Sequence, residues 1–228
     1  MKHFKRLQHI LFAGLVLITA ASCTKTHEEP APIISGLAFI AASPDAPGVT
    51  LFVDQNRVNY DSVRYSAQSD YLNAYSGNRQ VSAYQGLTKK VSADITLKQG
   101  KFYSLFLTGR WQNAEFVLLE DSLAKPETGK ANIRFLNMSV GAPSLDLGLD
   151  NGTTLVSGRN YKQNSGFIAV DGNKAYKFVI REHGATQAKA TLTAATLKAG
   201  HIYTIWAKGI YTASDTTTGP GGKIMENY

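Results

Sequence analysis

Cysteine is nearly absent from the sequence: Cys23 is the only one in 228 residues. A lone cysteine has no partner for a disulfide, so the fold does not depend on one. Histidine is scarce as well. Of five, only His183 and His201 lie beyond residue 27, and neither belongs to an HExxH or other close ligand spacing. We expect no metal site, and no cofactor motif is present.

A concentrated basic stripe is also missing. Residues 1–22 carry three basic and no acidic residues; without them, 21 Lys and Arg stand against 17 Asp and Glu. This small excess is spread along the chain, whereas nucleic-acid binding usually needs a basic cluster. We expect no nucleic-acid partner.

The first 22 residues have the pattern of an export signal. Lys2, Lys5 and Arg6 precede an apolar run over residues 10–21. This run has about the length of a signal-peptide core and is too short for a permanent membrane-spanning helix. We therefore predict that residues 1–22 are removed.

Cys23 follows the small residues Ala20, Ala21 and Ser22, which resembles the lipobox of bacterial lipoproteins. The resemblance implies that the leader is cut before Cys23, which is then acylated. This use of the sulfur excludes thiol catalysis. Ala20 departs from the pattern, because Leu is commonest there. The alternative is ordinary secretion with a free thiol.

An acylated Cys23 predicts a membrane location, because three acyl chains make desorption negligible. Thr24 stands where a retention signal for the inner membrane has aspartate, so we expect a lipid anchor in the bacterial outer membrane. The sequence leaves open whether the protein faces the periplasm or the outside. The stretch 23–35 is polar and contains Pro30 and Pro32, which predicts an extended tether.

The remaining chain contains an internal repeat. FIAASPDAPGVTLFVD at 39–54 returns as FLNMSVGAPSLDLGLD at 135–150, and LKQGKFYSLFLTG at 97–109 returns as LKAGHIYTIWAKG at 197–209. Two blocks in the same order, about a hundred residues apart, indicate two copies of a whole domain. We predict domains at 36–128 and 129–228, each with its own core.

The local pattern within each copy is typical of β-structure. Apolar Leu145, Leu147 and Leu149 alternate with polar or small residues, as expected for a half-buried strand. Further runs that predict strands fall near 79–85, 91–97, 101–108, 115–120, 174–181, 188–197, 201–207 and 222–228. About seven strands per copy predict an all-β fold of two tandem immunoglobulin-like antiparallel β-sandwiches.

The spacing Leu-x-x-Gly-x-x-Tyr occurs in both copies and ends at Tyr103 and Tyr203. It resembles the tyrosine corner of Greek-key sandwiches, in which the Tyr hydroxyl bonds to the backbone just upstream. The alternative is an ordinary strand tyrosine.

These motifs together point to a known family. Ser43 to Pro47, the alternating strand that ends at Asp54 and the later Leu-x-x-Gly-x-x-Tyr strand resemble domain-of-unknown-function family DUF4397 of exported bacterial proteins. Both copies resemble it, although the second has Val140 and Gly141 in place of Pro44 and Asp45. The resemblance implies a β-sandwich in the cell envelope and no established activity.

Catalytic patterns are weak. No Gly-x-Ser-x-Gly elbow is present, and GPGGK at 219–223 lacks the spacing and the helix of a phosphate loop. Asp54 and Asp150 are the one recurrent acidic pair, at positions that suit turn capping or, as the alternative, calcium. We predict that the protein is not an enzyme and has no catalytic residue.

Two aromatic residues and three hydroxyls are candidates for other roles. Phe106 and Trp206 alternate with the tyrosine-bearing face, so they contact either a ligand or the neighbouring domain. Ser62, Ser122 and Thr216 each follow an aspartate in an expected loop, which resembles the O-glycosylation sequon of exported Bacteroidetes proteins.

The sequence as a whole predicts a lipid-anchored envelope protein that acts as a non-catalytic binding or adhesion module for a glycan or an envelope protein. A structural spacer is the alternative without a ligand, and a carbohydrate-active enzyme is the catalytic alternative.

Overall fold

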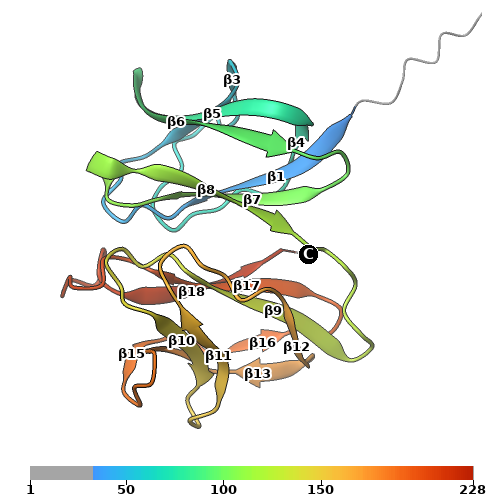
Figure 1. Ribbon diagram of the computed structural model, residues 1–228, viewed down its shortest axis with the longest axis vertical. Helices are drawn as coiled ribbons and strands as arrows, with labels where there is room; N and C mark the ends of the chain where they lie inside the picture. The colour runs from blue at the N-terminus through green and yellow to red at the C-terminus, as the bar shows by residue number, and fades with distance from the viewer. Residues whose placement is uncertain (1–32, 228) are drawn as a thin grey trace, which may run out of the picture. The chain divides into compact units, whose positions relative to one another are not determined.

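The computed structural model describes residues 33–227 (Figure 1). The predicted signal peptide, Cys23 and the tether up to Pro32 lie outside the described residues. From Ile33 onward the chain forms one compact unit with eighteen β-strands and one short 3-10 helix. No helix in this part of the chain is long and apolar enough to cross a membrane.

The first half is a sandwich of two four-stranded sheets. Its strands are β1 (Ile34–Ala41), β2 (Thr50–Val53), β3 (Asn56–Arg57), β4 (Leu72–Tyr75), β5 (Gly77–Gln85), β6 (Thr88–Leu97), β7 (Phe102–Thr108) and β8 (Glu115–Asp121). One sheet has the order β4-β1-β7-β8 and the other β3-β2-β5-β6. The 3-10 helix, Trp111–Asn113, lies in the loop between β7 and β8.

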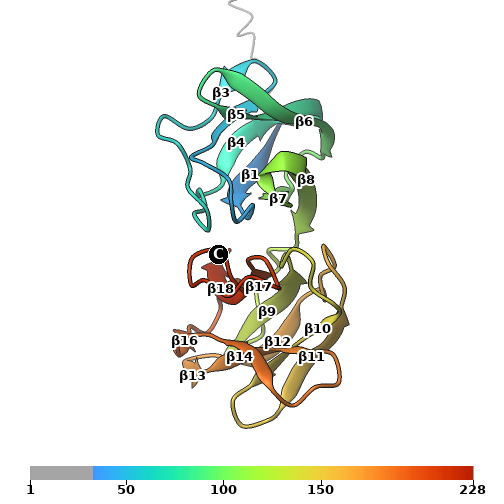
Figure 2. The ribbon, with the colours of Figure 1, turned by 90° about the vertical axis from the view of Figure 1, so that its left-hand side faces the viewer.

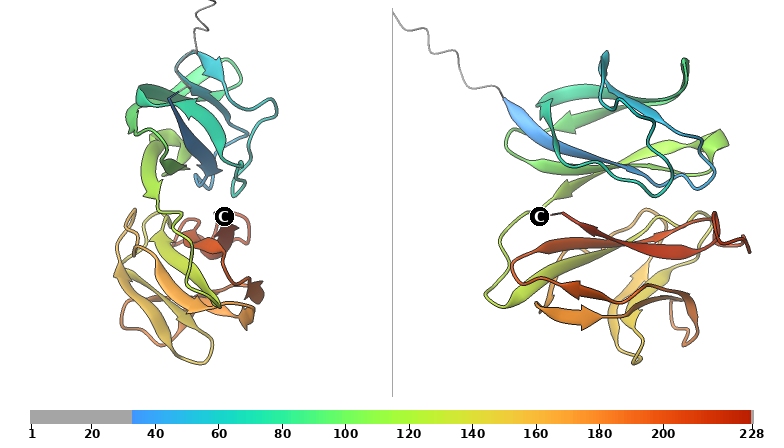
Figure 3. Two further views of the ribbon diagram at one scale, coloured as in Figure 1. Left: turned by 90° about the vertical axis from the view of Figure 1, so that its right-hand side faces the viewer. Right: turned by 180° about the vertical axis from the view of Figure 1, so that it is seen from behind.

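The second half is a sandwich with the same order of strands (Figure 2). Its strands are β9 (Lys130–Asn137), β10 (Leu145–Leu149), β11 (Thr154–Arg159), β12 (Ile168–Asp171), β13 (Lys174–Tyr176), β14 (Phe178–Glu182), β15 (Ala188–Thr191), β16 (Ala195–Leu197), β17 (Ile202–Lys208) and β18 (Gly221–Glu226). The sheets are β12-β9-β17-β18, β11-β10-β14-β15 and the short pair β13-β16. In Figure 3, β18 runs along β17 at the edge of its sheet.

The all-β sandwich fold is as predicted, with one difference in each half. β1 pairs with β7 in parallel, and β9 pairs with β17 in parallel, within sheets that are otherwise antiparallel. Leu37 lies opposite Tyr103 and Ile133 opposite Tyr203, so the two parallel pairs have the same register. Alternation of apolar residues does not reveal this pairing, because it shows which face a residue is on and not which strand lies beside it.

Each half has an apolar core of its own. The first core gathers buried residues between Leu37 and Leu107, and the second gathers residues between Ala131 and Ala207. Tyr103, Leu105 and Leu107 point into the first core, and Tyr203, Ile205 and Ala207 point into the second. The exact division into domains at residue 128 stays a prediction.

The two corner tyrosines make equivalent hydrogen bonds. The Tyr103 hydroxyl accepts a bond of 3.0 Å from the Lys98 backbone N–H, and the Tyr203 hydroxyl accepts one of 3.0 Å from that of Lys198. Both tyrosines are buried. The contact is the one that the spacing predicts, and it ties the start of β7 and of β17 to the preceding turn.

Candidate functional site

Phe106 and Trp206 lie between the two sandwiches. Both rings are fully buried, and their centroids are 5.9 Å apart in an edge-to-face arrangement. They belong to a third apolar cluster that joins both halves, with Ala38, Ile40, Ala42, Leu136, Met138 and Met225. The sequence left two roles open for these rings, contact with a ligand or with the neighbouring domain. The structure places both rings in the contact between the two halves, where neither ring has a face free for a ligand.

A buried ion pair lies beside this cluster. The Arg134 guanidinium of β9 donates to the Asp121 carboxylate of β8, and their side chains are 2% and 0% exposed. Ser104 and Tyr71 each donate a hydroxyl bond of 2.7 Å to Asp121, and Arg134 Nε donates one of 2.8 Å to Thr204. The charges are therefore paired and hydrogen-bonded, which a buried ion pair needs in order to persist.

Asn227 occupies in the second half the position that Asp121 has in the first. Tyr203 pairs with Glu226 as Tyr103 pairs with Glu120, and in each case the next residue reaches the interface. Thr204 donates a bond of 2.6 Å to the Asn227 amide oxygen, and the Asn227 amide donates one of 3.1 Å to Tyr71. Because Asn227 is neutral, the one guanidinium here faces a single carboxylate.

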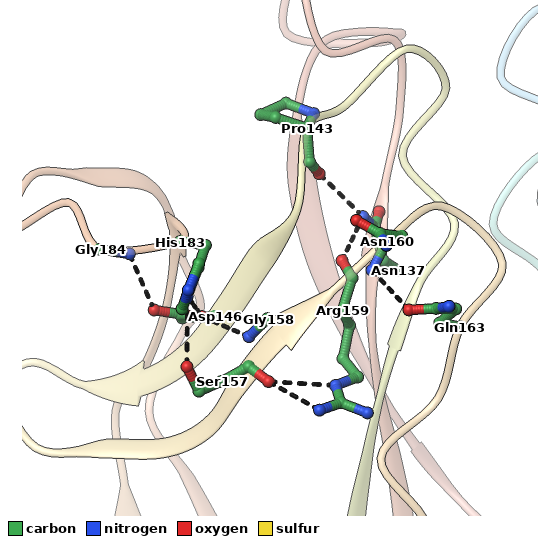
Figure 4. Close-up of polar contacts among 10 residues, drawn as sticks. All are labelled: Asn137, Pro143, Asp146, Ser157, Gly158, Arg159, Asn160, Gln163, His183 and Gly184. Atoms are coloured by element: carbon green, nitrogen blue, oxygen red, sulfur yellow. Dashed lines mark hydrogen bonds and ion pairs between the residues drawn. The ribbon is translucent and has the colours of Figure 1, made fainter.

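Ser157, His183 and Asp146 meet near the end of the β10-β14 pair (Figure 4). His183 Nδ1 lies 3.0 Å from Asp146 Oδ1 and 3.2 Å from Ser157 Oγ. The three residue types are those of a serine-hydrolase triad. In such a triad the serine bonds to one ring nitrogen and the aspartate to the other.

The geometry here is different, because the serine and the aspartate share the same nitrogen of His183. The Nδ1 proton can serve one partner at a time, so the ring cannot take a proton from Ser157 while Asp146 orients it through the other nitrogen. The arrangement does not support nucleophilic catalysis by Ser157.

Asp146 instead ties strand β11 and the β14-β15 turn to β10. It accepts backbone bonds of 2.6 Å from Gly158 and 3.3 Å from Gly184. Burial raises the pKa of the Asp146 carboxyl, but the hydrogen bonds from Gly158, His183 and Gly184 favour the ionised form more, so the pKa is lowered below 3.8. The carboxylate therefore fixes the β14-β15 turn beside the hollow described next.

A hollow of about 400 Å³ lies between the β14-β15 turn and the loop between β17 and β18. Its lining residues are Glu182, Ala185, Gln187, Ala188, Lys189, Tyr211 and Pro220. The Tyr211 hydroxyl donates to Glu182, and Lys189 Nζ lies 4.3 Å from the centroid of the Tyr211 ring. Burial and the contact with Glu182 raise the pKa of Tyr211 to about 12, so the phenol stays protonated at neutral pH.

The hollow has the composition of a polar ligand site. Volumes of a few hundred cubic ångströms with an aromatic wall and a few convergent polar groups are typical of small-ligand pockets. Sequence reasoning missed it, because Tyr211, Lys189 and Glu182 are far apart in the sequence. The signal that could have shown it is Tyr211, which stands one hundred positions after Trp111.

The other predicted site residues are dispersed. His201 contacts Glu226 at 2.6 Å, and Asp150 pairs with Lys177 at 3.5 Å. Asp54 accepts from the Gln80 backbone at 2.9 Å, which together with Arg79 lowers the pKa of its carboxyl. The Asp54 carboxylate therefore joins the end of β2 to the neighbouring strand β5, and its role in capping a turn stays a prediction. No group of three metal-ligating side chains is found within residues 33–227.

The three hydroxyls proposed for glycosylation are exposed in loops. Ser62, Ser122 and Thr216 all have this placement. Asp121, which precedes Ser122, is buried in the ion pair with Arg134. Glycosylation of Ser122 stays a prediction. An enzyme that modifies it would meet an exposed Ser122 but a buried Asp121.

Comparison with known proteins shows the family. The domain of unknown function DUF4397 matches residues 35–148, half of the chain. The chain belongs to the DUF4397 family. The DUF4397 match covers the whole first sandwich and ends within β10 of the second.

The other comparisons add no argument about function. Among solved structures, the chain is similar to the Bacillus anthracis TIE protein at 15% sequence identity and a TM-score of 0.25. That likeness covers 77% of this DUF4397 chain and 34% of the other, so it spans about a third of that protein's length. No curated protein matches the chain.

The buried ion pair gives a test by mutation. Asp121→Asn leaves the Arg134 charge buried without its partner, so we expect the free energy of unfolding of this DUF4397 protein to fall by about 3–5 kcal/mol. Urea denaturation measures the change. The control is Glu120→Gln, one residue earlier, which removes exposed contacts of 3.7 Å with Lys98 and Lys101 and should cost about 0–1 kcal/mol. Equal effects of the two substitutions would contradict the importance of the pair.

Asp146 gives a test by pH. Its pKa is lowered in the folded state, so its stabilising contribution is present above pH 3.8 and is lost as the pH falls below that value. We expect Asp146→Asn to cost about 1–2 kcal/mol at neutral pH and little at the acid end. Urea denaturation across this pH range measures both, with the exposed Asp94→Asn as control. A constant cost at every pH would show that the Asp146 charge is not what stabilises β11 and the β14-β15 turn.

Proposed function

We propose that this protein is a non-catalytic binding or adhesion module held on the bacterial outer membrane by a lipid on Cys23. The length of chain between Cys23 and the first sandwich supports this anchor, because Ile33 follows Cys23 by ten positions and β1 begins at Ile34. Ten extended residues reach about 35 Å. A chain of this length is long enough to let the folded part meet a ligand near the membrane.

The observation that carries the binding role is the hollow beside Tyr211. Glu182, Gln187 and Lys189 present an acceptor, an amide and an ammonium around one aromatic ring. These groups lie at loops and strand ends of a sandwich, where binding residues are commonly placed on a rigid scaffold. The turn that bears Glu182 is fixed by Asp146, so the site is preorganised.

The proposal that the protein is not an enzyme rests on the contacts of His183. Its Nδ1 serves both Ser157 and Asp146, and its side chain is 57% exposed. Exposure to water would also weaken any electrostatic effect of this group on a reaction. A carbohydrate-active enzyme would need two carboxylates facing one sugar, whereas the hollow contains Glu182 alone.

The spacer role remains the second candidate because of the buried contact between halves. Arg134 and Asp121 pair across a buried contact in which the two sandwiches touch directly. A rigid unit of this kind could lift a partner from the membrane without binding a small ligand.

The anchor has a direct test. Intact mass of Cys23 peptides and fractionation of cells should place the wild-type protein in the membrane fraction with acyl mass on Cys23, and Cys23→Ser should release it into the soluble fraction. The lipid accounts for this shift, because three chains hold a protein on a bilayer while no chain does. An unmodified Cys23 thiol in a soluble protein would support ordinary secretion instead.

The binding role is tested with the full-length protein in detergent. A glycan array and a pull-down from envelope extract should give at least one ligand, and Tyr211→Ala should weaken its binding at least tenfold, because truncation of a central aromatic commonly costs at least about 1.4 kcal/mol. Tyr60→Ala, at a tyrosine that is 95% exposed, is the matched control. If no ligand binds in either assay, the spacer role is the better description.

A further inference from the structure

The contacts around Tyr211 occur a second time in the first sandwich. There the Trp111 Nε1–H donates a bond of 3.2 Å to Gln85 Oε1, as the Tyr211 hydroxyl donates to Glu182. Lys90 Nζ lies 5.6 Å from the centroid of the Trp111 ring, as Lys189 Nζ lies over Tyr211. In both halves one aromatic ring thus donates to a Gln or Glu and has a lysine over its face.

Strand register shows that these residues hold corresponding positions. Leu51 lies opposite Ala83, and Ala83 opposite Val91; in the second half the same places are taken by Leu147, Ile180 and Ala190. Gln85 stands two positions after Ala83, as Glu182 stands two positions after Ile180. Lys90 directly precedes Val91, as Lys189 directly precedes Ala190.

The loop that carries the ring also corresponds in the two halves. Gly109 and Gly209 directly follow β7 and β17, with φ of 88° and 91°. An added Cβ would lie 2.8 Å from Asn113 O at Gly109 and 2.0 Å from Gly219 O at Gly209. Both loops therefore need glycine to turn there, and each places its ring two residues later.

Both rings pack partly against the core of their half, and it is the exposed polar groups around them whose conservation in kind favours a ligand. Trp111 in the first half corresponds to Tyr211 in the second, and the neutral Gln85 corresponds to the charged Glu182. In both halves the aromatic side chain is still the donor and a side-chain oxygen is still the acceptor. Gln85, Lys90, Glu182 and Lys189 are exposed. Exposed side chains add little to core stability, so retention of donor, acceptor and ammonium at both sites is not explained by packing alone.

We propose that the Trp111 and Tyr211 clusters are two equivalent subsites for neutral carbohydrate. This inference rests on the proposed binding function and names its ligand class. The apolar face of a sugar ring would stack on the aromatic ring, where the lysine now lies. A cation–π contact at an exposed site is weak, so the sugar displaces the ammonium easily. The displaced ammonium then donates to a sugar hydroxyl, and the Gln or Glu accepts from another.

The charges at the two subsites favour a neutral ligand. Glu182 and Lys189 both line the hollow beside the second ring, so their charges offset each other there, and the Glu182 carboxylate would repel an acidic sugar. The first subsite has Gln85 in place of Glu182, and there the Asp45 carboxylate, which accepts a bond of 2.7 Å from the Trp111 backbone N–H, offsets the charge of Lys90. A ligand that suits both must therefore rely on hydroxyls and a ring face and not on its charge.

The chain offers an internal probe of the first subsite. It contains two tryptophans, of which Trp206 is fully buried and Trp111 is partly exposed. Titration of the full-length protein in detergent with neutral gluco-, manno- and xylo-oligosaccharides should shift the Trp111 emission to shorter wavelength. The buried Trp206 emission should stay constant and reports that the fold is intact.

Variants at both subsites separate the outcomes. Retardation in gels that contain the matching neutral polysaccharide measures the affinity. The affinity should fall at least tenfold for Trp111→Ala and for Tyr211→Ala, and binding should be lost in the double variant. Lys90→Ala and Lys189→Ala keep the rings and should weaken binding less, while Tyr60→Ala should leave it unchanged. Trp111→Tyr should keep retardation near the wild-type value and lose the emission shift.

Three results would overturn the inference. Binding that depends on Tyr211 and not on Trp111 leaves the proposed function in place and refutes the second subsite. Capture of an envelope protein with no carbohydrate bound refutes the ligand class while binding stands. Carbohydrate binding that no ring variant changes refutes both subsites.

Discussion

The ion pair between Arg134 and Asp121 is the constraint on which the arrangement of the two sandwiches depends. Each charge loses its water at the interface, and only the other charge with its hydroxyl neighbours compensates for that loss. A different contact between the halves would leave one charge buried alone. The apolar cluster around Phe106 and Trp206 supplies non-directional attraction, whereas the ion pair selects one relative placement.

Much of the fold could be predicted because its signals are local. Alternation at Leu145, Leu147 and Leu149 locates β10, and the spacing that ends at Tyr103 and Tyr203 reports a bond between neighbours in sequence. The parallel pairing of β1 with β7 could not be predicted, since it joins strands with most of a sandwich between them. Periodicity gives the face of a strand, and its neighbour is decided by the whole sheet.

The candidate site was predictable only in part, for the same reason. The sequence pattern correctly put Phe106 and Trp206 on the face away from each core, but it could not tell that this face is covered. Arg134 gave no signal, because the corresponding residue in the first half is Ala38 and a repeat draws attention to what is shared. His183 and Asp146 lie 37 positions apart and meet only because β10 and β14 are neighbours.

Asp121 in the first half is charged, whereas Asn227 at the corresponding position of the second half is neutral. The contact surfaces of the two sandwiches therefore differ and fit each other better than either fits itself. Two first halves facing each other would bring together two carboxylates without a guanidinium, and two second halves would bring together two arginines without an acid. Self-association of like halves between neighbouring molecules is thereby disfavoured. Within residues 33–227 the two faces already bury each other, so neither is left to dock a further sandwich through the same contact.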